Sequence, residues 1–537
     1  MTGLPDQPRV KATDKAFWAP RPSGWLALAL GVVSATGFQP LALWPVAILA
    51  VGIFASLLPQ TRSVRHAAWL GWLFGLGHFT LGNSWIATAF TYQANMPAVL
   101  GWAAVPLLAV YLGIYPMLAA AGARRLAGKR RGLPMALAFA ACWIVAEWLR
   151  SWVFTGYAWN PLSMVLLGPM DRPGLAALAP LMGSYALSGV VVLIGAGLVF
   201  LLAERRWLQA GLGALLVAAG MMWPAPAAMP GRVALTLVQP GLPQPRVNDP
   251  LFYEANFNRL TGLSRRAVGR DTVPPARLVL WPESGMSDYL EEGYPQHHYD
   301  RTTALGSPLY ARSLIVRAIG REAVLLTGGT RLVFNDRRRL IAARNSVLAL
   351  DGRGQIIGTY DKAHLVPYGE YLPLRPLLEP LGLSRLVPGA IDFLPGPGPA
   401  TLDLGAFGKA GVQVCYEIVF SGQVIDRGNR PDYLTTGSND GWFGAAGPPQ
   451  HFAQARMRAI EEGLPVLRST TSGISGVIDA HGVVRHALGH DEQGRIDTLI
   501  PRALPPTLFA RMGNILALVW AAFFLLLAFV AMRRRPL

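Results

Sequence analysis

Long stretches without charge separate the polar positions of this chain. No Asp, Glu, Lys or Arg occurs in residues 22–61, 66–123, 173–203, 207–231 or 512–532. A helix that spans a membrane needs about 20 consecutive, mostly apolar residues. Charge-free stretches of this length argue against the buried helices of a soluble protein and predict membrane-spanning helices.

The apolar pattern predicts eight spans. Residues 22–61 are long enough for two helices, which the turn-forming residues 37–40 (GFQP) separate. Residues 66–123 hold two more, separated by the polar residues 91–95 (TYQAN). The last four spans are expected near residues 134–152, 181–203, 207–223 and 513–532.

Basic residues between the spans predict the orientation, because Lys and Arg gather in cytoplasmic loops. With eight spans, 16 basic residues fall on one side, whereas the other side of the membrane part has only Arg150 and Arg172. We therefore expect both termini in the cytoplasm and residues 232–511 on the opposite side. The 16 residues are Arg9, Lys11, Lys15, Arg21, Arg62, Arg65, Arg124, Arg125, Lys129, Arg130, Arg131, Arg205, Arg206, Arg533, Arg534 and Arg535.

Residues 232–511 have the pattern of a water-soluble domain. Short apolar runs rich in β-branched residues alternate with helical patterns such as 450–462, which predicts an α/β layered domain. The expected organisation is a membrane bundle in residues 1–231, an extracytoplasmic α/β domain in 232–511, and an eighth span with a basic tail in 512–537. The runs are 233–238, 278–281, 324–327, 346–350, 411–414, 433–436 and 466–469.

Composition supports this division. Charged residues are 15% and hydrophobic residues 52% of the chain, whereas about 25% is charged in a typical soluble protein. This low charge density argues against nucleic-acid binding despite the net charge of +17, and the apolar content excludes disorder. The membrane segments hold 18 basic and 5 acidic residues, and residues 232–511 hold 30 and 26, so most of the excess charge is a topology signal.

Three residues that can perform chemistry follow strand-like runs of the α/β domain. Cys415 follows the run 411–414, Glu283 follows 278–282, and Lys362 ends the stretch 356–362. Singly, each has a simpler interpretation: a small buried hydrophobe, a solvated carboxylate, and a surface lysine paired with its neighbour Asp361. Together they are more specific, because side chains at the ends of strands in one α/β domain can converge at one edge of the sheets.

These three residue types fit acyl transfer through a thioester. Glu283 can accept the thiol proton and later return it, while Cys415 attacks an acyl carbonyl as the thiolate. Lys362 can stabilise the oxyanion and lower the pKa of the thiol. We predict no metal site, because no two histidines have metal-ligand spacing on a helix.

Four motifs resemble the carbon–nitrogen hydrolase (nitrilase) superfamily: residues 281–284 (WPES), 360–362 (YDK), 366–370 (VPYGE) and 415–417 (CYE). The resemblance implies an αββα sandwich with a Glu–Lys–Cys triad, which Glu283, Lys362 and Cys415 match. With eight spans around such a domain, the chain resembles the apolipoprotein N-acyltransferase family over nearly its whole length. Residues 439–444 (NDGWFG) and 450–473 also match that family in pattern.

The resemblance implies the last step of bacterial lipoprotein maturation. In this step the N-terminal S-diacylglyceryl-cysteine of an apolipoprotein is N-acylated, with a membrane phospholipid as acyl donor. The expected mechanism is ping-pong through a thioester on Cys415, without cofactor, metal or nucleic acid. The expected location is the bacterial inner membrane, with the catalytic domain in the periplasm.

The resemblance also implies supporting residues. Glu370 matches a further glutamate, which we expect to hold Lys362, and Tyr416 and Glu417 match an essential pair beside the nucleophile. The chain departs from the family at Asn248, where a tryptophan is common, and this departure puts one aromatic substrate contact in doubt. Two smaller departures are Leu464, before a proline, where arginine is usual, and Gly441, where alanine is usual.

Three aromatic residues are candidates for substrate contact. Trp442 and Phe443 belong to the glycine-rich segment 437–447, which we interpret as a mobile lid that excludes water from the thioester. Trp159 lies in the far-side loop 155–161. That loop also fits an interfacial aromatic belt beside a snorkelling pair, Glu147 and Arg150.

Two other function classes compete with acyl transfer. A membrane-tethered amidase or nitrilase that hydrolyses a soluble substrate fits the triad equally well, because one fold serves many reactions. Only the membrane bundle argues against it. A transporter with an inactive outer domain is disfavoured, because transporters usually bury ionisable groups at mid-membrane and these spans have almost none.

Overall fold

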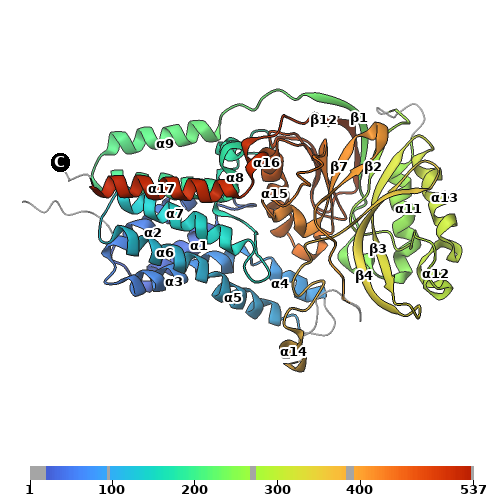
Figure 1. Ribbon diagram of the computed structural model, residues 1–537, viewed down its shortest axis with the longest axis horizontal. Helices are drawn as coiled ribbons and strands as arrows, with labels where there is room; N and C mark the ends of the chain where they lie inside the picture. Colours follow the sequence, from blue (N-terminus) through green and yellow to red (C-terminus); the bar gives the residue numbers. More distant parts are fainter. Residues whose placement is uncertain (1–19, 93–96, 267–273, 382–391, 534–537) are drawn as a thin grey trace, which may run out of the picture.

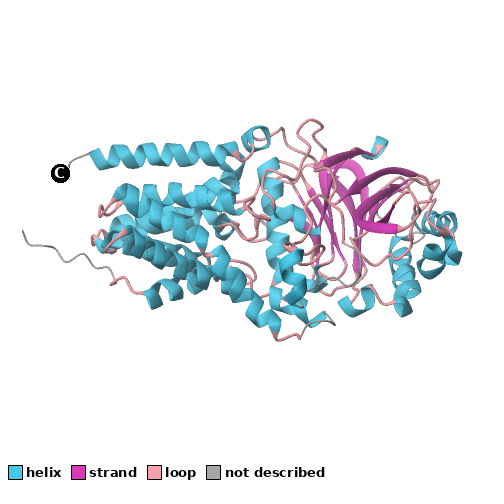
Figure 2. Ribbon diagram, turned by 60° about the horizontal axis from the view of Figure 1, so that its bottom comes forward, coloured by secondary structure: helices cyan, strands magenta, loops and turns pink. Residues whose placement is uncertain are grey.

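The chain folds into a helical bundle and a two-sheet domain that lie end to end (Figures 1 and 2). The computed structural model describes residues 20–92, 97–266, 274–381 and 392–533. The sheet domain is inserted before the last helix of the bundle, α17, which packs against α7 and α8. Of the basic residues that predict the topology, Arg9, Lys11, Lys15, Arg534 and Arg535 lie outside the described residues.

Each predicted span contains a helix, and α5 and α6 together form the fourth. Within the part of the chain that the structure describes, four helical segments are long and apolar enough to cross a membrane: Leu100–Ala127, Leu133–Arg150, Leu175–Ala203 and Ile515–Arg533. Shorter apolar helices occupy Gly24–Ala35, Trp44–Gln60 and Trp207–Met221, so the count of eight spans stays a prediction. The helices are α1 (Gly24–Ala35), α2 (Trp44–Leu57), α3 (Val64–Gly82), α4 (Ile86–Ala89), α5 (Leu100–Leu112), α6 (Ile114–Ala127), α7 (Leu133–Arg150), α8 (Ala179–Ala203), α9 (Trp207–Met221) and α17 (Ile515–Arg533).

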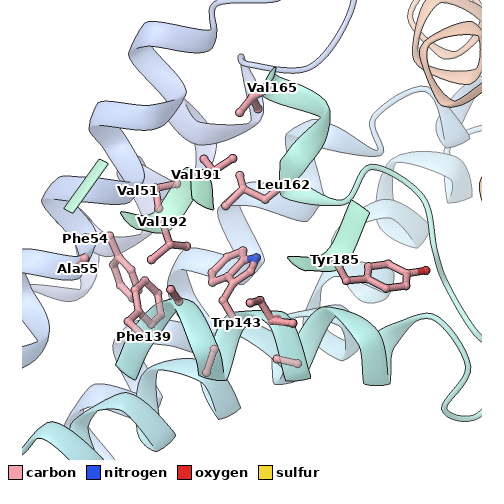
Figure 3. Close-up of a cluster of buried hydrophobic side chains, with 14 of the residues drawn as sticks. Val51, Phe54, Ala55, Phe139, Trp143, Leu162, Val165, Tyr185, Val191 and Val192 are labelled. Carbon is pink, nitrogen blue, oxygen red and sulfur yellow. The ribbon is translucent and has the colours of Figure 1, made fainter. Parts of the chain in front are cut away.

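The bundle core is apolar and closely packed (Figure 3). Phe54 of α2 lies with its ring centroid 5.9 Å from that of Phe139 of α7, and Trp143 lies 5.6 Å from Phe139. Helices α2 and α8 touch through their backbones, because a Cβ at Gly52 would lie 2.1 Å from the carbonyl oxygen of Gly195. Small residues at helix crossings allow such contact in membrane proteins.

Two six-stranded sheets form the second domain, in the orders β12-β1-β2-β3-β4-β5 and β11-β10-β9-β8-β7-β6. Strands β1, β2 and β3 are parallel, as are β7, β8 and β9, so each trio ends at one edge of its sheet. The strands are β1 (Pro230–Gln239), β2 (Leu278–Leu280), β3 (Val324–Phe334), β4 (Leu340–Leu350), β5 (Ile356–Asp361), β6 (Ala400–Asp403), β7 (Lys409–Val414), β8 (Tyr433–Ser438), β9 (Val466–Thr470), β10 (Ser475–Ile478), β11 (Val484–Leu488) and β12 (Gly494–Pro501).

Helices cover the outer face of each sheet and complete the expected αββα sandwich. Along β2, Leu278 and Leu280 pack between the sheets, whereas Val279 faces the core under the outer helices, as strand alternation requires. Helices α11 (Tyr253–Ser264) and α13 (Pro308–Ile319) cover the first sheet, and α15 (Gly447–Glu462) covers the second. The remaining helices are α10 (Gln244–Val247), α12 (Gln296–Thr302), α14 (Arg375–Leu378) and α16 (Leu508–Met512).

Helix α15 is buried on all sides because it lies between the second sheet and the bundle (Figure 1). The sequence predicted one apolar face for residues 450–462. Instead Phe452 and Ala455 pack on the sheet side, while Met457 and Ile460 join the core of the bundle. A helix held between two cores needs two apolar faces, and a single-face pattern does not describe it.

Buried polar contacts fix α15 to the bundle. The guanidinium of Arg456 donates to the carbonyl oxygens of Gly168, Pro169 and Arg172 at 2.7–2.9 Å. The backbone N–H of Ser184 in α8 donates to the carboxylate of Glu461 at 2.6 Å. Buried polar groups that satisfy each other in this way hold the two domains in one relative position.

Candidate active site

The three sequence-predicted residues meet where strands of both sheets end. Glu283 follows β2, Lys362 follows β5, and Cys415 follows β7 and opens a short 3₁₀ helix, Cys415–Val419. The first two strands belong to one sheet and β7 to the other. The site therefore lies between the ends of the two sheets.

Lys362 is buried between two carboxylates. Its ammonium Nζ lies 2.9 Å from Glu370 Oε2 and 3.7 Å from Glu283 Oε1, and the side chain is 1% exposed. Burial alone would lower the pKa of Lys362, but the charges of Glu370 and Glu283 raise it above its ordinary value. The lysine is therefore a fixed cation, and the pairing with Asp361 that we considered is wrong, because Asp361 binds Arg331 instead.

Asn345 of β4 links the two carboxylates and was missed by the sequence analysis. Its side-chain Nδ2 donates to Glu283 Oε1 at 2.7 Å and to Glu370 Oε1 at 2.8 Å. The backbone N–H of Asn439 donates to the second oxygen of Glu283 at 2.8 Å. Polar donors therefore hold the carboxylate of Glu283 from two sides.

Cys415 adopts a strained backbone conformation, with a φ of 50°. Non-glycine residues rarely adopt positive φ, and such outliers gather at functional sites. Burial raises the pKa of the Cys415 thiol and Glu283 raises it further, while Lys362 opposes them. The resting side chain is therefore a thiol, and it needs a base to become the nucleophile.

Glu417 joins the nucleophile strand to the lysine loop. Its Oε2 accepts the backbone N–H of Val414 at 2.7 Å. Its Oε1 accepts the backbone N–H groups of Ala363 and His364 and the hydroxyl of Tyr360, at 2.7–3.1 Å. Burial raises the pKa of Glu417 although these donors oppose the rise. Tyr416 is also buried and packs edge-on against Phe420.

The three candidate substrate contacts, Trp159, Trp442 and Phe443, lie close together, but their side chains differ in solvent exposure. Trp159 is 1% exposed and donates from Nε1 to Gln450 Oε1 at 2.8 Å. Phe443 packs against Trp159, with ring centroids 5.9 Å apart, and both Trp442 and Phe443 are half-buried in a short 3₁₀ helix, Asp440–Phe443. Burial of Trp159 favours a structural role for this side chain, and substrate contact at all three stays a prediction.

One departure from the family pattern has a steric reason. A Cβ at Gly441 would lie 2.7 Å from Gln244 Oε1. Glycine at this position therefore lets the segment after β8 approach α10. Asn248, the other departure near this segment, is exposed after the end of α10.

Glu147 and Arg150 do not form the snorkelling pair that we considered. Both are buried, and Glu147 Oε1 accepts the indole N–H of Trp143 and the backbone N–H of Leu162. Arg150 donates to the carbonyl oxygen of Trp159 at 2.8 Å. The loop after α7 packs against α15 and is not in water. Glu147 and Arg150 therefore hold this loop in place through buried hydrogen bonds.

No group of three or more His, Cys, Asp and Glu side chains in the described ranges could hold a metal ion. A histidine beside Cys415 has other partners. His451 Nε2 lies 3.0 Å from the carbonyl oxygen of Cys415, and Nδ1 lies 3.0 Å from Asp440 Oδ1. The sequence analysis did not identify this histidine as a site residue. The one feature that could have indicated it is a polar side chain within α15, a helix that the structure buries.

Comparison with known proteins finds relatives of both domains. The family description "Apolipoprotein N-acyltransferase N-terminal domain" matches residues 30–197, and "Carbon-nitrogen hydrolase" matches residues 236–504. The apolipoprotein N-acyltransferase of Rhodopseudomonas palustris is 34% identical, with 96% of each chain covered. That of Bradyrhizobium diazoefficiens is also 34% identical, over 95% of this chain and 96% of the relative.

Two solved structures resemble part of the chain. A nitrilase-superfamily amidase from Nesterenkonia AN1 is 17% identical, covers 51% of this chain and 92% of its own, and has a TM-score of 0.33. Nit3 of Saccharomyces cerevisiae is 17% identical, covers 52% and 93%, and has a TM-score of 0.34. The identity and coverage of the full-length relatives show that this chain is an enzyme that belongs to the apolipoprotein N-acyltransferase family.

Proposed function

We propose that this enzyme N-acylates the N-terminal diacylglyceryl-cysteine of apolipoproteins, with a membrane phospholipid as acyl donor. The observation that carries the proposal is the convergence of Glu283, Lys362 and Cys415 in a chain that matches this family over nearly its whole length. The catalytic unit would be residues 232–511, held between the membrane segments 1–231 and 512–537.

The first half-reaction forms a thioester. Glu283 removes the proton from the Cys415 thiol, and the thiolate attacks the carbonyl carbon of the phospholipid sn-1 ester. Lys362, fixed as a cation between Glu283 and Glu370, stabilises the oxyanion of the tetrahedral intermediate. The carbon–oxygen bond of the ester then breaks, and Glu283 returns its proton to the departing alkoxide oxygen, so that the lysophospholipid leaves with a free hydroxyl.

The second half-reaction forms an amide. The α-amine of the lipoprotein cysteine attacks the thioester carbonyl and loses a proton to Glu283. The carbon–sulfur bond breaks, and the sulfur of Cys415 regains a proton from Glu283. Both substrates are anchored in one leaflet, so the membrane bundle supplies proximity that a soluble enzyme would lack. Within segment 437–447, the half-buried or exposed residues 441–446 are our proposed lid against water during this step, whereas Ser438 and Asp440 are held by buried polar contacts.

We place the enzyme in the bacterial inner membrane with the catalytic domain in the periplasm. The basic residues predicted as cytoplasmic support this orientation. The α8–α9 connection and the C-terminal end of α17 lie at the end of the bundle away from the sheets (Figure 1).

Intact-mass analysis after incubation with phospholipid tests the proposal. We expect wild type to gain the mass of one acyl group, and Cys415→Ala and Glu283→Gln to gain none. An adduct on Cys415→Ala would refute the mechanism. No adduct on wild type, together with hydrolysis of soluble amides, would instead favour the membrane-tethered amidase.

A further inference from the structure

A ring of buried polar side chains lies behind the nucleophile, and the mechanism above does not use it. His451 of α15, Asp440, Arg468 and Ser438 are all buried. Arg468 binds Asp440 at 2.6 Å, and the hydroxyl of Ser438 donates to Asp440 Oδ1 at 2.6 Å. These residues come from β8, β9, α15 and the segment after β8, so the tertiary structure alone assembles the ring.

The ring contacts Cys415 at its backbone. His451 Nε2 lies 3.0 Å from the Cys415 carbonyl oxygen, which can only accept a hydrogen bond, so Nε2 carries a hydrogen. Burial lowers the pKa of His451 and Arg468 lowers it further, which favours the neutral ring. Nδ1 lies 3.1 Å from Arg468 Nη2, which can only donate, and 3.0 Å from Asp440 Oδ1, which can only accept. In the neutral ring Nδ1 accepts from Arg468, and this bond selects the tautomer that donates to Cys415.

The ring also lies beside the side chain of Cys415. Ser438 and Cys415 directly follow the paired residues Gly437 and Val414 of adjacent strands, and the Ser438 hydroxyl donates its hydrogen to Asp440. Burial opposes the charge of Asp440, but Arg468 and the hydroxyl of Ser438 hold the pKa of this carboxyl well below its usual range. Asp440 is therefore a fixed anion that orients both Ser438 and Arg468.

Cys415 needs such support because of its backbone. A φ of 50° is unfavourable for a non-glycine residue, and such a conformation persists only when its surroundings hold it. We propose that His451, Ser438 and Asp440, with Arg468 as counter-ion, are positioning residues that hold Cys415 in this conformation, with its sulfur toward Glu283 and Lys362. The inference rests on the proposed function, because it takes Cys415 as the nucleophile.

Two variants of His451 separate the hydrogen bond from packing. In His451→Gln the amide nitrogen can reach the position of Nε2, whereas in His451→Asn the side chain is one methylene shorter and cannot. Gln454→Leu is the matched control, because Gln454 is equally buried on α15 and makes only a 3.4 Å contact to Asn160 Oδ1.

Two rates are measured for each variant: acylation of Cys415 by phospholipid in mixed micelles, and alkylation of Cys415 by iodoacetamide as a function of pH, read by peptide mass. For His451→Asn we expect both rates to fall by about tenfold or more, since small misplacements of reacting groups are costly. Its alkylation midpoint should also move to higher pH, because the sulfur leaves Lys362, whose charge favours the thiolate. His451→Gln and Gln454→Leu should stay within about threefold of wild type.

Wild-type rates in His451→Asn, or equal losses in His451→Gln and His451→Asn, would overturn the proposal. If His451→Asn does not fold, Ser438→Ala decides: it removes the hydroxyl that holds Asp440, so we expect both rates to fall by about tenfold or more, and wild-type rates would refute the ring. Alkylation needs no lipid. The failure of wild type to take an acyl group would therefore contradict the proposed function while leaving the test of the ring intact.

Discussion

Glu417 offers a sharp test of how the two sheets are joined at the site. It contributes no atom to the proposed chemistry, yet its carboxylate accepts four hydrogen bonds from Tyr360, Ala363, His364 and Val414. The first three donors flank Lys362, and the fourth precedes Cys415. We expect Glu417→Gln to loosen the connection between the lysine and the nucleophile.

The structure sets the size of the effect. Glutamine has one acceptor oxygen, so at best that oxygen keeps the three donors near Lys362. The N–H of Val414 then faces an amide NH₂ group and stays unpaired. A buried donor without a partner costs about 1–3 kcal/mol, and the lost bond was to a carboxylate, so we expect a loss of about 2–3 kcal/mol. For a domain of this size, that loss lowers Tm by roughly 4–10 °C.

Thermal unfolding in detergent, followed through tryptophan fluorescence, measures this shift, and acyl-adduct formation measures the effect on the site. The control is Glu322→Gln, which changes an exposed glutamate of the same domain. If Glu417→Gln unfolds within a degree of wild type and acylates at the wild-type rate, the joining role of Glu417 is wrong.

Two further predictions concern the packing of Gly328 against the backbone of Glu283 and the protonation of the buried carboxyl of Glu462. Gly328→Ala would place a Cβ 2.1 Å from the Glu283 carbonyl oxygen, so we expect a loss of about 1–3 kcal/mol and a lower acylation rate. Gly262→Ala, with nothing within 4 Å, should cost no stability in the same unfolding assay, and equal effects would contradict the steric argument. Burial raises the pKa of Glu462 to about 7, so the folded state favours its protonated form. The stability from that proton is complete below the unfolded pKa and is lost as pH rises through about 7. Glu462→Gln should therefore raise Tm at pH 8 more than at pH 5, and an equal change at both pH values would refute this assignment.

The sequence predicted the layered fold because its signals are local. Apolar runs such as 278–281 and 411–414 became β2 and β7, since β-branched and aromatic residues are enriched in strands. Charge-free stretches became bundle helices for the same reason. The face of α15 was misread, because only the docked bundle turns Met457 and Ile460 into core residues.

Some residues of the site could be identified from the sequence, and others only from the tertiary structure. By itself the sequence determined that Glu283, Lys362 and Cys415 end strands, and the resemblance supplied Glu370 and Glu417. The tertiary structure alone decided that Asn345 links two carboxylates and that His451 binds the carbonyl of Cys415. It also decided that Trp159 binds Gln450. The reason is physical: where a strand ends is set by neighbouring residues, whereas these hydrogen bonds join residues far apart in sequence, and their partners meet only after both sheets and the bundle have packed.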